Sequence, residues 1–423
     1  MRFLKIFALG AAMAVSSAAQ AQTLTVWHDL GDNGVKWFAE LNELYKKTNP
    51  GVTIASVSYP TDQWFGRVIA ALNTGSPPDL IYNNYERVIR IQNQTNKVMD
   101  LKAEFQTLAD RAFLSDDDLR VATYKDRMII LPIQRVQMAL GARKSWLEKV
   151  GEPFPKTWAD TLRVATKFQK EDPDGNGRQD TFGFALQAAN PRDLIHMLDL
   201  FMVGTGLRNT VIDPAGKIVI DEPRRAEVLK EFLKVFAEYK LVAPDTINHS
   251  FGDMYKLIEG GRAGFFRVGD WNVRKWDAEA IKGDFVSGPW PAFRAGDKNA
   301  VVIGGMRGIA VPDNAPNKAA SVAFAKFMLT KEAQSASLTN VGAAVRGDFP
   351  IADLSERRMY FAQQKDAMAA YDFPESIHPA YPEIEAAYHK ALLVAISSPP
   401  SDWDAFIKKT AADLQKLADS KKP

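Results

Sequence analysis

The feature that most constrains the fold is an alternation of strand-like and helix-like segments between residues 23 and 82. Short apolar runs at 23–27, 52–57 and 79–82 are typical of buried strands. The two stretches between them repeat their apolar residues at 3.6-residue spacing, and each ends at a turn containing proline and glycine. Short connections between such segments predict an α/β fold with a parallel sheet covered on both faces.

The same pattern points to the place where a ligand would bind. In sheets of this kind ligands lie beyond the carboxyl ends of the strands. The residues at those ends are Trp27, His28 and Asp29 after the first strand, and Asn83 and Asn84 after the third. We therefore expect polar contacts with a ligand from these two loops.

The rest of the chain is also mixed α/β. Apolar stripes predict helices at 224–239, 319–329, 384–395 and 402–417. A chain of 423 residues is too long for one core, yet no linker rich in proline and serine separates two contiguous domains. This predicts lobes that are connected by several chain crossings.

The first residues have the pattern of a secretory signal peptide. A basic start with Arg2 and Lys5 precedes the apolar run 6–15, and Ala19-Gln20-Ala21 fits the cleavage pattern. The apolar run is about half the length of a membrane-spanning helix. We expect cleavage near Ala21 and a periplasmic protein that does not span the membrane; a buried N-terminal helix is the alternative.

The charge balance gives no sign of a nucleic-acid or anionic-membrane partner. Of 53 basic residues, Arg2 and Lys5 lie in the expected signal peptide, and the remaining 51 equal the 51 acidic residues. A chain with no net charge lacks the basic surface that such partners require.

Motifs for catalysis are missing from the sequence. There is no cysteine, so thiol nucleophiles and Cys-ligated metals are excluded. The sequence contains neither a Gly-x-Ser-x-Gly elbow nor a phosphate-binding loop. No zinc-type spacing connects the five histidines, which are His28, His196, His249, His378 and His389. We expect no enzyme and no catalytic cofactor; a secreted carbohydrate-active enzyme is the alternative from another class.

A calcium-binding loop is predicted between residues 172 and 180. Oxygen-bearing side chains stand at loop positions 1, 3, 5 and 9, and position 7 would offer a backbone carbonyl. The five expected ligands are Asp172, Asp174, Asn176, Arg178 and Asp180. The bidentate Glu of the full motif is missing, because position 12 is Gly183. A structural calcium ion is the prediction, and a solvated turn is the alternative.

Aromatic and cationic side chains supply the other candidates for ligand contacts. Trp271 follows an apolar strand and stands among polar residues, which predicts a loop whose indole ring stacks on a ligand. Trp64 shares a helical stripe with apolar residues, so packing accounts for much of its surface, and Trp290 is equally compatible with either role. The arginines near strands or turns are Arg135, Arg143, Arg267, Arg307 and Arg346. Converging arginines would select an anion, whereas pairing with a protein carboxylate such as Asp270 is the alternative.

In several segments the sequence resembles the extracellular solute-binding proteins of ABC sugar importers, the family that includes maltose-binding protein. The segments that carry the likeness, in order, are 24–27, 74–80, 146–151, 155–158, 172–184, 261–266, 304–305 and 379–382. The chain departs from relatives that commonly have Tyr-Tyr-Asn before the helix near 145, because it has Leu140-Gly141-Ala142-Arg143. This departure argues against a simple maltodextrin ligand.

The resemblance implies a periplasmic-binding-protein fold with two α/β lobes, three hinge crossings and a ligand cleft between the lobes. By analogy the crossings lie near 131–134, 303–305 and 329–332. The N-terminal lobe would then contain 22–133 and 304–330, and the C-terminal lobe 134–303 and 331–423. Closure of such lobes around a solute is a hinge motion.

The expected function is the capture of a carbohydrate and its delivery to the transmembrane subunits of an ABC permease, by a monomer. A receptor for an acidic solute, such as a uronate, sugar sulfonate or sugar phosphate, is the alternative. The residues expected to bind the ligand are Trp27, His28, Gln63, Trp64, Asn83, Asn84, Gln134, Arg135, Arg143, Asp270, Trp271, Gly304, Gly305, Arg307 and Arg346.

Overall fold

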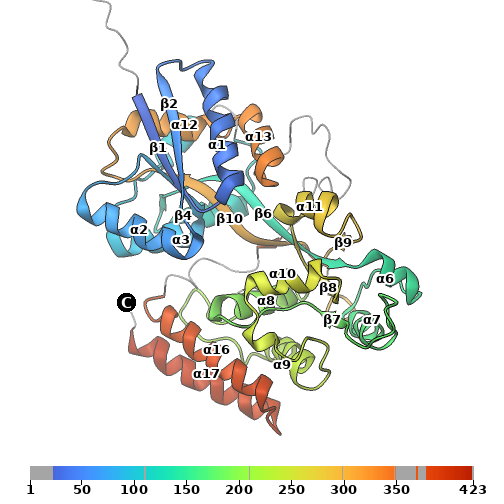
Figure 1. Ribbon diagram of the computed structural model, residues 1–423. Helices are drawn as coiled ribbons and strands as arrows, with labels where there is room; N and C mark the ends of the chain where they lie inside the picture. The colour runs from blue at the N-terminus through green and yellow to red at the C-terminus, as the bar shows by residue number, and fades with distance from the viewer. Residues whose placement is uncertain are drawn as a thin grey trace, which may run out of the picture.

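The computed structural model contains two α/β lobes joined by long strands (Figure 1). It describes residues 22–108, 111–208, 210–297, 299–346, 348, 368–369 and 378–421. The signal peptide expected at 1–21 therefore lies outside the described residues. Strands β6 (Leu131–Ala142) and β10 (Val302–Ala310) run from one lobe into the other.

The N-terminal lobe contains the predicted strand–helix alternation. Its elements are β1 (Gln22–His28), α1 (Gly31–Lys46), β2 (Val52–Ser58), α2 (Thr61–Thr74), β3 (Leu80–Asn84), α3 (Tyr85–Thr95), α4 (Lys102–Gln106), α5 (Asp116–Ala122), β4 (Thr123–Tyr124), β5 (Arg127–Met128), α12 (Lys318–Phe327) and α13 (Lys331–Val341). Strands β2 and β3 both pair with β1 in parallel, which confirms the prediction from the first 60 residues after Gln22.

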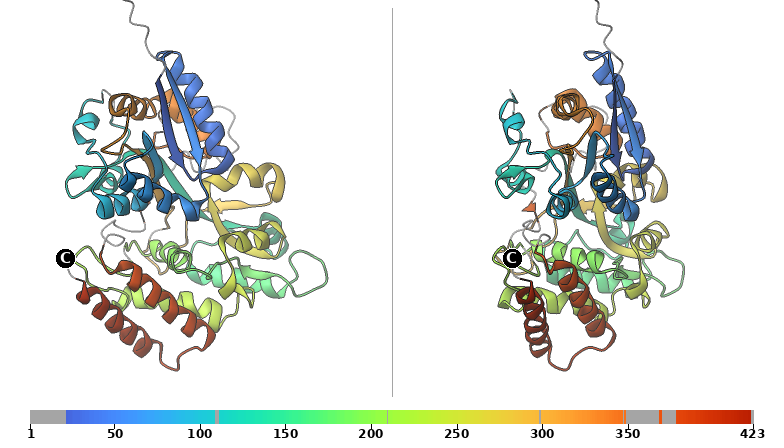
Figure 2. Two further views of the ribbon diagram at one scale, coloured as in Figure 1. Left: turned by 60° about the vertical axis from the view of Figure 1, so that its left-hand side comes forward. Right: turned by 90° about the vertical axis from the view of Figure 1, so that its left-hand side faces the viewer.

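The C-terminal lobe is richer in helices, and α17 lies at its far end from the N-terminal lobe (Figure 2). Its elements are α6 (Lys144–Lys149), α7 (Trp158–Lys170), β7 (Phe182–Phe184), α8 (Pro191–Val203), α9 (Pro223–Ala237), the 3-10 turn η1 (Thr246–Asn248), α10 (Phe251–Glu259), β8 (Ala263–Gly269), α11 (Asp270–Lys275), the π-helical turn η2 (Trp276–Ala280), β9 (Val286–Gly288), α16 (Tyr381–Ser397) and α17 (Trp403–Ser420). The four helices predicted by apolar stripes are confirmed as α9, α12, α16 and α17, with ends shifted by one to three residues.

One mixed sheet passes through both lobes. Its strand order is β2-β1-β3-β10-β6-β8-β7, with β9 paired to β6 and β11 (Met368–Ala369) paired to β10. Strand β10 is antiparallel to both β3 and β6. Its register against β6 shifts between Ile303 and Gly305, so the glycine pair Gly304-Gly305 lies at an irregularity of the hinge strand.

The core of the N-terminal lobe forms because α1 and α2 each present one apolar face to the sheet. Trp37, Phe38, Leu41 and Tyr45 recur along one face of α1, and all are buried. Hydrogen bonds of polar groups also connect the sheet to the helices that cover it. Buried Asp79 accepts hydrogen bonds from the backbone nitrogens of Thr25 on β1 (2.8 Å) and Asn317 before α12 (3.1 Å).

The lobe boundaries differ from those expected at two places. Helix α13 packs against α1, and its Ala333 and Ala336 belong to the core of the N-terminal lobe, as does Val345. The assignment of residues 331–345 to the C-terminal lobe, and a crossing at 329–332, are therefore corrected, because these apolar side chains are buried in the other core. The third passage of the chain comes after Val345.

The two other crossings lie in β6 and β10. Along β6, Leu131 and Ile133 are buried in the N-terminal core, whereas Met138 and Leu140 are buried in the C-terminal core. On β10 the change occurs between Val302 and Ile303. We call the surface where the lobes meet beside these two strands the interlobe seam.

Candidate functional site

Two residues expected to bind the ligand lie in the N-terminal core. Trp64 and His28 are fully buried. The His28 ring stacks on Phe38 with centroids 5.1 Å apart, and its Nδ1 accepts a hydrogen bond from the backbone nitrogen of Leu30 at 3.2 Å. Burial lowers the pKa of His28 to about 4, so the ring is neutral at pH 7. Both residues therefore have packing roles in this structure, and their contact with a ligand stays a prediction.

Three other expected residues have local partners. Buried Gln134 accepts a hydrogen bond from the Tyr82 hydroxyl and donates one to Ser337 Oγ (2.9 Å), so it connects β3, β6 and α13. Trp27 is half-buried and packs edge to face on Tyr59. Gln63 is exposed on α2 and accepts a hydrogen bond from Arg67 at 3.1 Å. Of the three, Gln134 has its amide oxygen and nitrogen hydrogen-bonded within the hinge, and its contact with a ligand stays a prediction.

Four of the expected arginines are paired with carboxylates. The pairs are Arg135 with Asp118, Arg143 with Asp284, Arg307 with Asp29 and Arg346 with Asp348. Arg346 also stacks on the ring of Phe113 at 4.2 Å, and Arg143 also donates to the backbone oxygen of Ile258. The alternative of carboxylate pairing accounts for these four cations, although Asp270 is not the partner in any pair. They provide no argument for an anionic ligand.

The N-terminal half of the seam is organised around Asp29, which follows β1 directly. Its Oδ1 accepts from Arg307 Nη1 at 2.8 Å, and its Oδ2 from Arg87 Nη1 at 3.3 Å. The carboxylate is 1% exposed. Burial by itself would raise its pKa, but the two guanidinium groups outweigh burial and lower the pKa below its usual value. Asp29 is therefore an anion that both cations share.

Strand β3 places its last two residues beside this ion triad. Asn84 pairs with Arg307, and Asn83 with Gly308, in the antiparallel register of β3 and β10. Asn83 is buried, and a hydrogen bond from its side chain also helps to lower the pKa of Asp29. Asn84 is only half-buried. The structure thus brings three expected residues, Asn83, Asn84 and Arg307, together at the strand ends.

Asp270 is the residue of the C-terminal lobe that lies near the Asp29–Arg307 ion pair. Its Oδ2 accepts a hydrogen bond from the backbone nitrogen of Gln137 on the hinge strand β6, at 2.8 Å. Burial raises the pKa of Asp270 well above its usual value, and the nearby charge of Arg307 opposes this only in part. Gly342, which ends α13 at φ +84°, lies directly against it, since a Cβ there would stand 2.9 Å from the Asp270 carbonyl oxygen. The seam is closed tightly at this point.

Trp271 is held in a defined orientation, although not in the loop that the sequence predicted. Residues 270–275 form helix α11, because the backbone nitrogen of Gly269 donates to Asn272 Oδ1 (3.2 Å) and closes the first turn. The indole Nε1 donates to the Tyr255 hydroxyl at 3.1 Å, and that hydroxyl donates to Asn272 at 3.0 Å. The ring covers Gly269, where a Cβ would lie 2.3 Å from it. Trp271 remains half-buried.

An ion pair connects the lobes at the edge of the seam. Arg192 on α8 and Glu86 on α3 approach to 2.8 Å, with side-chain exposures of 46% and 15%. Other acidic groups lie close by. Burial, followed by the charge of Glu86, raises the pKa of Glu385 on α16, and burial raises the pKa of Asp199 to about 7.

Sequence reasoning missed several of these groups. Asp29 stands in a loop that the strand pattern singled out, but its pairing with Arg307, 278 residues away, has no signal in the sequence. Tyr255 and Trp271 are 16 residues apart on different helices, and no spacing rule predicts their hydrogen bond. The Glu86–Arg192 pair joins α3 to α8 and depends on lobe packing.

The predicted calcium loop forms a tight turn outside the seam. Asp172 accepts hydrogen bonds from the backbone nitrogens of Asn176 (3.1 Å) and Gly177 (3.0 Å), and the Asn176 amide donates to Asp174 and Asp180. No group of three or more His, Cys, Asp or Glu side chains in the described part of the chain is arranged to hold a metal. Calcium binding stays a prediction that rests on the spacing of the loop.

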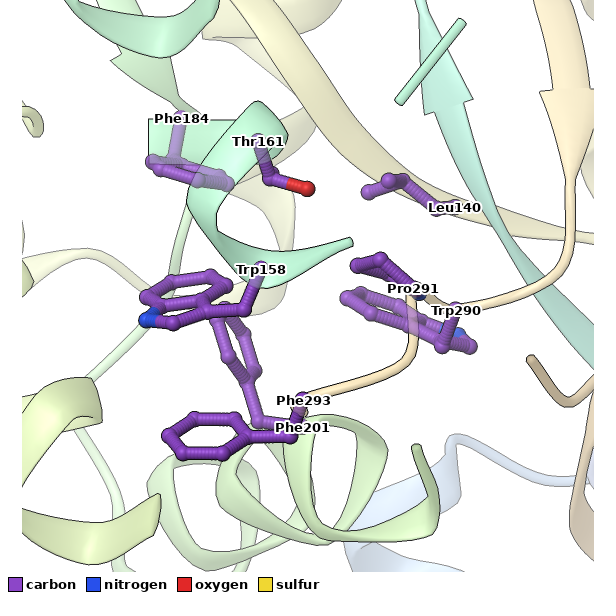
Figure 3. A pocket seen from close by; sticks show the side chains of 8 residues that line it. All are labelled: Leu140, Trp158, Thr161, Phe184, Phe201, Trp290, Pro291 and Phe293. Carbon is purple, nitrogen blue, oxygen red and sulfur yellow. The ribbon is translucent and has the colours of Figure 1, made fainter. Parts of the chain in front are cut away.

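A small apolar cavity of about 10 Å³ lies inside the C-terminal lobe (Figure 3). Its wall is built from aromatic side chains, and Trp290 packs there with its ring centroid 5.5 Å from that of Phe201. A space of this size holds at most one water molecule. Trp290 therefore has a packing role.

Comparison with known proteins gives a family. The family model of bacterial extracellular solute-binding proteins matches residues 30–335. A fructooligosaccharide ABC transporter substrate-binding protein, FusA of Streptococcus pneumoniae serotype 4, is 29% identical over 169 residues, which are 38% of this chain and 30% of the relative. The putative ABC transporter periplasmic-binding protein YcjN of Escherichia coli K12 is 26% identical over 190 residues, 44% of this chain and 42% of the relative. The chain thus spans less than half the length of these relatives.

Solved structures share the fold. A solute-binding protein from Thermotoga lettingae bound with alpha-D-tagatose superposes with a TM-score of 0.76 at 17% identity, covering 94% of this chain and all of that one. Maltose-bound MalE3 of T. maritima gives 0.75 at 19%, with 94% and 100% covered. These likenesses confirm the two-lobe periplasmic-binding-protein fold. Within the described residues, no helix has the length and apolar character that a membrane span requires.

Proposed function

Because the chain belongs to the family of bacterial extracellular solute-binding proteins, we propose that it binds a carbohydrate at the interlobe seam and delivers it to the permease of an ABC importer. The observation that carries the proposal is that the indole ring of Trp271 and the polar residues of β3 and β10 lie on opposite sides of the interlobe seam. Trp271 is fixed by Tyr255 on one side of the seam, and Asn84 and Arg307 stand on the other. Sugars combine apolar C–H faces with hydroxyl groups, so stacking and hydrogen bonding are both needed.

The names of relatives support the same class of solute. FusA is named for fructooligosaccharides, and the solved neighbours hold tagatose and maltose. The Leu140–Arg143 segment makes a maltodextrin less suitable here, since Arg143 is buried in an ion pair and contributes no aromatic surface. We propose a short saccharide as the ligand. Membership of this family supports binding without catalysis.

The test is a calorimetric screen of neutral and acidic mono- and disaccharides, followed by Trp271→Ala. Loss of a buried aromatic face should weaken binding by about 1–3 kcal/mol. Trp403→Ala is the matched control, because Trp403 lies on α17 at the far end of the same lobe and donates to Glu238 (2.8 Å). The Trp403→Ala variant should have a lower melting temperature and an unchanged affinity for the sugar. Equal affinities for wild type and Trp271→Ala would reject the stacking site, and no binding to any sugar would reject the function.

A further inference from the structure

One arginine of the seam differs from all those described above. Arg267 on β8 is 2% exposed, and its Nε and Nη2 are buried with no hydrogen-bond partner in the part of the chain that the structure describes. No carboxylate of the described residues forms an ion pair with it. Buried polar groups in proteins almost always have partners, and each exception needs an explanation.

The surroundings of Arg267 stack on its guanidinium group without neutralising it. Its Cζ lies 4.8 Å from the ring centroid of Phe251 and 5.9 Å from that of Trp271. The titratable group that senses its charge is His196 on α8. Burial, and then the positive charges of Arg267 and Arg192, lower the pKa of His196 well below its usual value, so that ring is neutral. The positive charge of Arg267 is therefore uncompensated on every side described.

Aromatic stacking leaves the edge of the guanidinium group available. The two neighbouring rings favour the cation, but the N–H groups point outward in the guanidinium plane and still need acceptors. A planar fork of this kind matches carboxylate, sulfonate or phosphate oxygens in a bidentate manner. Phe251 is 37% exposed, so one of the two rings that contact Arg267 reaches the protein surface.

We propose that Arg267 is the specificity-determining residue of the solute site and that it binds an oxyanion carried by the sugar. The inference rests on the proposed function, since Trp271 would stack on the same solute. An uncompensated buried cation lowers the stability of the ligand-free protein, and an anionic solute would remove that cost. The anionic alternative thus depends on Arg267, and not on the four arginines that protein carboxylates already neutralise.

The first experiment compares neutral sugars with their acidic counterparts. Glucose and glucuronate, galactose and galacturonate, and glucose and its 6-sulfonate are titrated into wild type, Arg267→Met, Arg267→Lys and the control Arg262→Met. Arg262 is exposed and also stacks on a phenylalanine, Phe182, at 5.3 Å. Wild type and the control should bind the acidic member of a pair at least tenfold more tightly. Arg267→Met should lose that preference and change neutral-sugar affinity less than twofold.

The variant Arg267→Lys keeps the proposal testable if Arg267→Met does not fold. Arg267→Met should melt at or above the wild-type temperature when ligand-free, because it removes an unpaired buried charge. If it fails to fold, Arg267→Lys decides: it should weaken acidic sugars more than neutral ones. A wild-type preference for the neutral sugar, or equal weakening of both sugars by either variant, would overturn the proposal while leaving sugar binding in place.

A second experiment does not require a sugar. Inorganic sulfate is titrated at constant ionic strength against chloride, with tryptophan fluorescence and melting temperature as readouts. Sulfate should stabilise wild type and Arg262→Met but not Arg267→Met, even if no tested sugar binds and the proposed function fails. An identical response of wild type and Arg267→Met to sulfate would overturn the anion role of Arg267.

Discussion

The two halves of the interlobe seam differ in whether their buried arginines have a carboxylate counterion. On the N-terminal side, Arg307 and Arg87 share the buried carboxylate of Asp29. On the C-terminal side, Arg267 has no counterion among the described residues, and burial raises the pKa of Asp270. The first half is a finished ion network that can offer hydroxyl-pairing groups without changing its own charge. The second half stays unbalanced until a solute arrives, which is why we place selectivity there.

The largest effect on stability is expected when the N-terminal half of the seam loses its carboxylate counterion, just as Arg267 in the C-terminal half has none among the described residues. Asp29→Ala leaves two partly buried guanidinium groups without a counterion, and breaking a buried pair in this way costs about 3–5 kcal/mol of unfolding free energy. Urea unfolding would measure the loss. Asp32→Ala is the control, because Asp32 is an exposed carboxylate in the first turn of α1. Similar losses for both variants would show that the Asp29 network is not a stability element.

The pH dependence of stability should separate the two halves. The pKa of His28 is lowered to about 4 in the folded protein, so the unfolded chain binds a proton between pH 6.5 and 4 while the folded chain does not. Stability should fall by about 3 kcal/mol as pH drops through that window, and His28→Gln should remove this slope.

Asp270 should give a pH dependence of stability of the opposite sign. Its pKa is raised in the folded protein, so the folded state holds a proton that the unfolded state releases, and stability should fall as pH rises above 4. Asp270→Asn should remove this second slope. Unfolding curves of wild type and both variants from pH 4 to 8 check the pair of effects. Parallel curves for all three proteins would show that neither group is linked to folding.

The loop at 172–180 is a third case, in which acidic groups crowd together and Lys149 donates to the backbone oxygen of Asp172 at 2.6 Å. The pKa of Asp174 is raised by burial and by the neighbouring carboxyl of Asp172. If calcium binds there, chelation should remove about 2–3 kcal/mol of stabilisation, the value for an ion present at about a hundred times its dissociation constant. Sugar affinity should not change, because the loop lies away from the seam.

Calorimetry with and without chelator, together with elemental analysis, tests this prediction. Asp172→Asn should abolish the chelator effect. Asp213→Asn should not, although Asp213 makes the same kind of turn, accepting from the backbone nitrogens of Ala215 (2.9 Å) and Lys217 (2.8 Å). A metal-free protein that is insensitive to chelator would identify the loop as a solvated turn.

The smallest effect is expected where the two halves touch. Arg192→Ala removes the ion pair with Glu86, and a pair this exposed contributes about 0–1 kcal/mol. The loss should favour the open arrangement of the ligand-free protein and lower sugar affinity by less than about fivefold. Small-angle scattering and titrations at low and high salt measure both effects. Lys217→Ala, which breaks the exposed pair with Glu222 inside one lobe, should change neither.

The order of elements and the identity of the core were determined by the sequence itself. Periodicity placed β1, α1, β2, α2 and β3, because apolar spacing is a local property and each of these helices buries one face. The same logic explains why Trp64 is a core residue: it lies on the apolar stripe of α2. The family resemblance supplied the two-lobe architecture, and it also gave the wrong third crossing.

What only the tertiary structure decided is which charges are neutralised. Asp29 and Arg307 are 278 residues apart in the chain, and the pairing of β1 with β3 and of β3 with β10 brings Arg307 to the end of β1. Arg267 could not be told from Arg307 in the sequence, since both follow apolar strand residues. The difference between them is whether a carboxylate from another element reaches the guanidinium group. Such an encounter depends on long-range packing and on burial, which no local pattern encodes.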